Sequence, residues 1–88
     1  MIIASSVSVG TAVVQVASPD DNPQIVILHN EAHDSANDLF IGPIDVTTAS
    51  GLHLPKGETL TVHLDAGDAL FAIGDGGPID IRVLQTKR

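Results

Sequence analysis

The sequence predicts an all-β fold, a small single-domain β-sandwich or a jelly-roll-like barrel of roughly six to eight short antiparallel strands. Three observations favour it: β-branched runs recur at short intervals, Gly, Pro and Asp turns separate them, and no segment combines a helical period with helix caps. The inner faces of two opposed sheets would supply a single core. We expect residues 10–88 to form this domain and residues 1–9 to form an N-terminal arm or an edge strand.

The first half of the chain contains two β-branched runs, 11–16 (TAVVQV) and 24–29 (QIVILH), with the turn-forming SPDDNP between them. This order predicts a hairpin. A polar segment at 30–38 follows and leads into LFIG, which we expect to be a short strand that IDVTT continues beyond Pro43.

The clearest alternation lies at residues 58–64, where Leu60, Val62 and Leu64 fall on one face and polar side chains on the other. This strand should therefore have one buried face. The PKG sequence at 55–57 predicts a tight turn before it, because proline fixes φ and glycine can take the positive φ that follows.

Two further strands close the chain. Residues 69–73 form a short apolar run that ends in GDGG, which we interpret as a hairpin turn because it lacks the lysine and the following helix of a P-loop. Ile79, Ile81 and Val83 then alternate with their neighbours in a last strand. We expect the final TKR to be a frayed or partner-held tail.

The N-terminal MIIASSVSVG is β-branched yet rich in serine, a pattern typical of a strand or of an ordered arm that pairs with a neighbouring subunit. It has no basic region and no sustained apolar run, so we expect no signal peptide. No run in the chain approaches the length of a membrane span.

Length and composition narrow the class of protein further. A chain of 88 residues can form only a small hydrophobic core, and without cysteine it has no disulfide to add stability. Oligomerisation is therefore favoured as a source of stability. The net charge of −7 repels phosphate backbones and anionic lipid, which argues against nucleic-acid and membrane partners. Only Phe40 and Phe71 are aromatic, so stacking platforms for bases or sugars are poorly supplied.

Two histidine pairs are candidate sites. His29 and His33 have the spacing of a metal pair, completed by Glu31 or Asp34, but only if the segment is helical, and Asn30 stands where the HExxH motif has its glutamate. We expect solvated loop histidines instead. A second pair, at positions 53 and 63, flanks the PKG turn and could face across a hairpin as a pH-sensitive contact at an interface. We expect exposed polar positions instead, because they lie opposite the apolar face of the strand.

Acidic loops offer the remaining candidate ligands. Calcium prefers carboxylate oxygens, and the candidates that the loops provide are Asp20, Asp21, Asp34 and Asp38. No stretch follows the EF-hand pattern, and aspartate is common in turns because its side chain bonds the backbone two residues on. We therefore predict no cofactor and no metal site. Without GxSxG or another convergent catalytic set, we also predict that the protein is not an enzyme.

The second half of the chain, DLFIGPIDVTTASGLHLPKGETLTVHLDAGDALFAIGDGGPIDIRVL, resembles small β-rich virion proteins encoded by tailed bacteriophages. Those proteins read as a strand ending in glycine, DVT, a loop with glycine, L-x-L-P-x-G, an alternating strand, G-D-A-L-[FY]-A, a glycine turn and V-R-V-L. The matching residues are Gly42, Asp45–Thr47, Gly51–Pro55, Gly57, Gly67–Ala72 and Arg82–Leu84. Phe71 stands where tyrosine is more frequent.

The resemblance implies a structural role without catalytic residues. It implies a capsid decoration or cement protein that is made in the bacterial cytoplasm, binds the major capsid protein on the outer head surface, and stabilises the shell as a homo-oligomer, with a trimer expected. A tail, baseplate or head-to-tail joining protein is the first alternative. The second is a β module that binds calcium or carbohydrate through the acidic loops.

Overall fold

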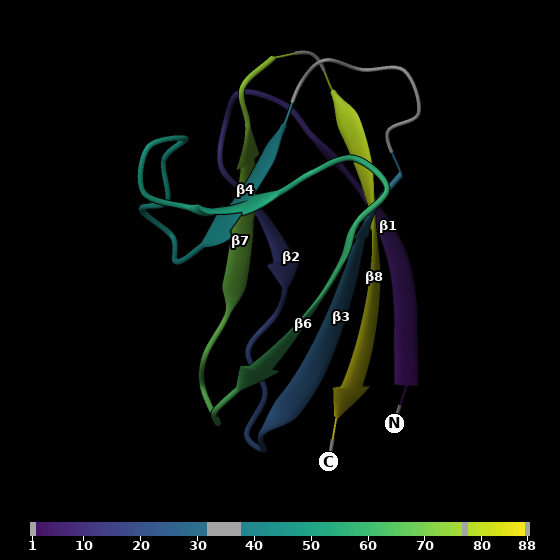
Figure 1. Cartoon of the computed structure of the whole chain (residues 1–88). Helices are drawn as coiled ribbons and strands as arrows, with labels where there is room; N and C mark the ends of the chain where they lie inside the picture. The colour runs from purple at the N-terminus through teal and green to yellow at the C-terminus, as the bar shows by residue number, and fades with distance from the viewer. Residues whose placement is uncertain (1, 32–37, 77, 88) are drawn as a thin grey trace.

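The computed structural model describes residues 2–31, 38–76 and 78–87. Within them the chain forms eight strands and no helix: β1 (Ile2–Val9), β2 (Val14–Ala17), β3 (Gln24–Asn30), β4 (Leu39–Gly42), β5 (Leu52–Leu54), β6 (Thr59–Leu64), β7 (Leu70–Gly74) and β8 (Ile79–Lys87). Sheet A has the order β1-β8-β3-β6 and sheet B the order β2-β7-β4-β5, and the two pack as a sandwich (Figure 1). The all-β prediction is confirmed. The described part of the chain has no helix of the length and apolar character needed to cross a membrane.

The strands pair in a nested order, β1 with β8, β2 with β7, β3 with β6 and β4 with β5, and every pair is antiparallel. The chain is therefore one long ribbon whose closed end is the loop between β4 and β5. Successive pairs of the ribbon fall in alternate sheets. Within sheet A the pairing of β3 with β8 joins its two pairs, and within sheet B the pairing of β4 with β7 does the same. This strand order is that of a jelly roll, with both termini at the same end of sheet A (Figure 1).

Two predicted hairpins are wrong. The runs on either side of SPDDNP form β2 in sheet B and β3 in sheet A, and GDGG connects β7 of sheet B to β8 of sheet A. A turn sequence reports that the chain reverses, but the same glycine, proline and aspartate residues serve a connection within a sheet and one that crosses between sheets. In this chain both connections cross between the sheets and do not form hairpins, because each apolar strand face needs an opposing sheet to cover it.

The expected continuation of β4 through IDVTT is also wrong, because β4 ends at Gly42 and the chain turns back. Val46, only 2% exposed, folds over the outer side of sheet B. There it covers Gly42 and Gly51, where an added Cβ would lie 2.8 Å from Val46 Cγ2. The loop is closed by the N–H of Gly51, which donates to the carbonyl of Thr47 at 2.9 Å.

The chain ends also differ in part from expectation. The segment predicted as an arm or an edge strand is described from Ile2 onward as β1, an edge strand of sheet A. Of the two alternatives for the final TKR, fraying is wrong for Thr86 and Lys87, because their backbones lie in β8 opposite Ile25 and Gln24 of β3. The partner-held tail stays a prediction. Long-range pairing with β3 holds this end of the chain, and the tail sequence alone does not reveal it.

Alternating residues form the core, as predicted. Ile79, Ile81 and Val83 are buried, and Leu60 and Val62 pack against the same cluster. The PKG turn is confirmed as well: Gly57 has a φ of 77°, and the N–H of Glu58 donates to the carbonyl of Pro55 at 3.1 Å.

Replacement of Gly51 by alanine should destabilise the fold. The new Cβ would lie 2.7 Å from the Cβ of Phe40 and 2.8 Å from Val46 Cγ2, so the loop must move. We expect Gly51→Ala to cost about 1–3 kcal/mol of unfolding free energy in urea titrations. Gly10→Ala is the matched control, because an added Cβ there meets nothing within 4 Å. Equal midpoints for the two variants would contradict this packing.

Candidate functional site

The candidate calcium ligands are not gathered at one place. Asp20 and Asp21 lie in the connection that precedes β3, whereas Asp38 lies beyond the other end of β3, just before β4. Asp34 lies outside the described residues. Across residues 2–31, 38–76 and 78–87, no group of three or more His, Asp or Glu side chains could hold a metal ion.

His29 belongs to strand β3, so the helical spacing on which the metal pair depends is absent at this residue. Its Nδ1 lies 2.9 Å from Thr59 Oγ1 on the neighbouring β6, and its Nε2 lies 3.6 Å from Glu31 Oε1. His33 lies outside the described residues. The described part of this candidate is thus a surface histidine that bridges two strands of sheet A.

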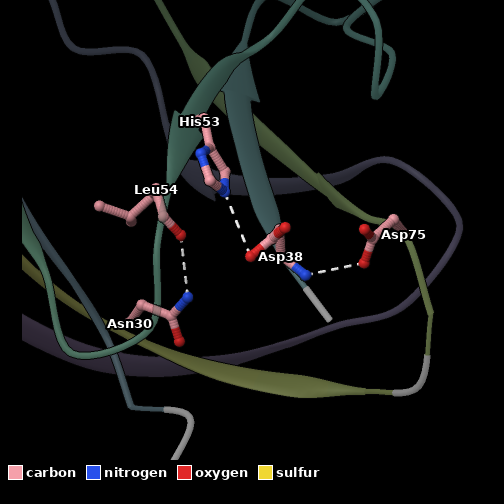
Figure 2. Close-up of polar contacts among 5 residues, drawn as sticks. All are labelled: Asn30, Asp38, His53, Leu54 and Asp75. Carbon is pink, nitrogen blue, oxygen red and sulfur yellow. Dashed lines mark hydrogen bonds and ion pairs between the residues drawn. The ribbon is translucent and has the colours of Figure 1, made fainter. Parts of the chain in front are cut away.

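The possible contact between the histidines at 53 and 63 does not form, because His53 lies in β5 of sheet B and His63 in β6 of sheet A. Both are exposed, as expected. His53 instead reaches Asp38, with 3.2 Å between Nε2 and Oδ1, and stacks on the ring of Phe40 at 5.2 Å between centroids. The backbone N–H of Asp38 donates to Asp75 Oδ1 at 2.7 Å (Figure 2). These contacts tie the start of β4 to β5 and to the turn after β7.

This polar cluster is exposed, since the side chains of His53 and Asp38 are 48% and 40% accessible. An ion pair so open to water contributes about 0–1 kcal/mol, and it exists only when the histidine is protonated. The geometry of this cluster is therefore that of a weak surface contact between neighbouring strands.

A buried amide closes one end of the sandwich. Asn30, the last residue of β3, is fully buried, and its Nδ2 donates to the carbonyl of Leu54 in β5 at 2.9 Å (Figure 2). Its backbone N–H donates to the carbonyl of Glu58, and its carbonyl accepts from Gly57. One residue of sheet A therefore holds both sides of the PKG connection. Sequence reasoning assigned Asn30 to a polar loop and missed this role.

A second amide pair lies at the opposite end of β3. Gln24 and Gln85 are buried, and Gln85 Nε2 donates to Gln24 Oε1 at 2.9 Å. Gln24 Nε2 in turn donates to the carbonyl of Ser18 at 2.7 Å, so the pair also fixes the connection from sheet B. The sequence does carry a signal for both ends, because Gln24 and Asn30 are in phase with the buried Val26 and Leu28.

The outer face of sheet A carries an apolar surface that we call the outer patch, formed by Ile2, Ala4, Ile25, Ile27 and Leu84. Register places these side chains on three adjacent strands: Ala4 lies opposite Leu84, and Leu84 opposite Ile27. Ile2 is 69% exposed and Leu84 36%. A hollow of about 380 Å³ lies along the seam of β1 and β8 beside the outer patch, lined by Ala4–Ser6 and Arg82–Leu84.

The outer patch was also missed from sequence, although β3 contains a clue. Its run QIVILH is apolar at successive positions, a pattern typical of a strand covered on both faces, whereas a sheet with one wet face alternates. In this chain the second sheet covers only the inner side of β3. The outward Ile25 and Ile27 are therefore only partly buried.

Comparisons of the chain with protein-family models, with curated proteins and with solved structures give no match.

Replacement of Asn30 by leucine tests the amide that closes the sandwich. The variant keeps the number of side-chain heavy atoms and their branched shape but leaves the carbonyl of Leu54 without its side-chain donor. We expect the free energy of unfolding in urea to fall by about 1–3 kcal/mol. Asn22→Leu, at an exposed turn position, should change it by less than about 0.5 kcal/mol. A loss of similar size in both variants would show that the amide has no special role.

Proposed function

We propose that this chain is a non-enzymatic structural protein of a tailed-bacteriophage virion, a capsid decoration protein that binds the outer head surface and stabilises the shell as a homo-oligomer. The identification of the virion rests on the resemblance of residues 38–84 to phage virion proteins. The jelly-roll strand order supports it by analogy, because viral capsid domains are among the proteins that use this order.

The observation that carries a binding role is the outer patch. A sheet face in contact with water is expected to be polar, and contiguous exposed apolar residues mark sites where proteins bind one another. The apolar side chains of Ile25, Ile27 and Leu84 lie side by side on two neighbouring strands, an extended apolar surface of the kind that marks contacts between proteins.

Docking through the outer patch would also stabilise the chain itself. A domain of 88 residues has a thin core and, without cysteine, no disulfide. A partner that binds only the folded chain stabilises it by mass action. Shell and decoration protein would therefore stabilise each other, which is the property that a cement protein needs.

The direct test is to locate the chain in virions. Particles of the phage that encodes the chain would be purified and analysed by mass spectrometry. They would also be labelled with a gold-conjugated antibody against the chain. We expect the chain in the particles and the label over the heads. Label over the tails would overturn the head-surface assignment, and particles without the chain would overturn the virion role.

A charge in the outer patch should weaken shell binding. Ile27 is half-buried on the outer face, and Ile27→Asp would place an unpaired carboxylate in the contact. When purified variants are added back to particles from a deletion phage, we expect at least about tenfold weaker binding, equivalent to about 1.4 kcal/mol. Thr48→Asp, at an exposed position in the loop between β4 and β5 of sheet B, adds the same charge away from the outer patch as a control. Circular dichroism checks that both variants are folded, and equal binding would exclude the outer patch as the shell contact.

A further inference from the structure

Strand β1 has one edge that no other strand pairs with among the described residues. It is the first strand of sheet A, so its backbone N–H and C=O groups bond to β8 on one side only. Pairing with β8 runs without interruption from Ile2 opposite Thr86 to Val9 opposite Ile79. The strand contains no charge, no proline, no glycine and no bulge along its eight residues. Such an edge is a template for another strand.

The other three edges of the sandwich are protected. β2 has four residues and a register shift between Gln15 and Ala17, and β5 has three residues. β6 has six residues but carries the exposed His63 and lies between Glu58 and Asp65. Short length, bulges and charges are the devices by which sheets avoid pairing at their edges. Only β1 lacks all of them among the edge strands that the structure describes.

We propose that β1 pairs antiparallel with β1 of a second copy of this chain, so that sheet A continues across both copies. The local electrostatics permit this occupant: each copy carries a net charge of −7, which opposes association in general, but none of the eleven acidic residues lies in β1. Two copies can therefore approach along β1 without placing carboxylates opposite one another. A two-fold pairing also closes after one step, whereas pairing β1 with a different edge would require one of the protected strands.

The register of the pair follows from symmetry. An antiparallel pair of identical strands in one sheet has its two-fold axis perpendicular to the sheet, so outward side chains meet outward side chains. In β1 the even-numbered residues face outward with Ala4 and Leu84, and the odd-numbered residues face inward with Val7 and Val9. Long overlap then requires that Ser5 or Ser6 lies on the axis. Both are exposed.

The pairing places the outer patches of the two copies on the same side of the dimer. Because the axis is perpendicular to the sheet, both outer patches face one direction, and the dimer would contact the shell through two linked surfaces. Linked binding exceeds the affinity of either surface when both can engage. This consequence rests on the proposed function, but the pairing itself does not. A two-fold pair also predicts an even-numbered assembly in place of the trimer that the resemblance implies.

The first experiment measures the solution mass of the full chain and of two variants by sedimentation equilibrium. Ser6→Glu adds a carboxylate near the axis in both copies, while Arg82, directly opposite in β8, accommodates it within one copy. Thr61→Glu, on the edge strand β6, changes the net charge equally. We expect dimers for the wild type and for Thr61→Glu, and at least tenfold weaker association for Ser6→Glu. A wild-type monomer or trimer, or equal association of both variants, would overturn the proposal.

The second experiment locates the axis by cross-linking. The chain has no cysteine, so Ser5→Cys and Ser6→Cys each introduce a single thiol. Residues directly opposite in an antiparallel pair have Cα atoms about 4.5–5.5 Å apart, within the range of a disulfide. On oxidation we expect one of the two variants to form a disulfide-linked dimer well above the level of Thr61→Cys. Cross-linking of neither variant above that control would overturn the β1 pairing, and the result is independent of whether the particles contain the chain.

Discussion

The whole sandwich depends on how the ends of one central strand are closed. The inner row of β3 places the apolar Val26 and Leu28 between two buried amides, Gln24 and Asn30. Asn30 bonds across to sheet B through the carbonyl of Leu54, and Gln24 fixes the connection that arrives from sheet B. In a domain with so thin a core, water would otherwise reach the backbone where the chain crosses between sheets. The amides supply the hydrogen bonds that water would have made, and they fix the geometry of both crossings.

Closure of the ends leaves the two outer faces with different roles. On sheet B the loop after β4 returns, and Val46 packs over Gly42 and Gly51 beside Phe40. Part of that face is thus covered by the chain itself. On sheet A no described loop packs in this way over Ile25 and Ile27, which remain half-exposed. The asymmetry arises from the nested ribbon, because its closed end lies in sheet B and its two free ends lie in sheet A.

Local pattern predicted the elements, whereas their placement required knowledge of distant strands. The alternation around Val62 and the positive φ of Gly57 are properties of a few adjacent residues, so both were predictable. Membership of a sheet is set by pairings such as Ile2 with Thr86, almost the full chain apart, and no turn sequence encodes them. Asn30 was misjudged for the same reason, since its partner Leu54 belongs to the other sheet. The outer patch was encoded in the double-sided apolar run of β3, but its exposure became evident only with the sheet order.

The acidic surface and the uncharged β1 edge act together. An unprotected strand edge in a neutral protein invites indiscriminate pairing and aggregation. Here each copy carries a charge of −7, so copies repel one another in most orientations, and an approach along β1 brings no carboxylate of that strand into contact. Pairing of β1 with β1 of a second copy would then cover the one unprotected edge among the described strands of each copy. The same strand that would make association possible would therefore also limit it, because after two copies had joined, only short, bulged or charge-flanked edges would remain among the described strands.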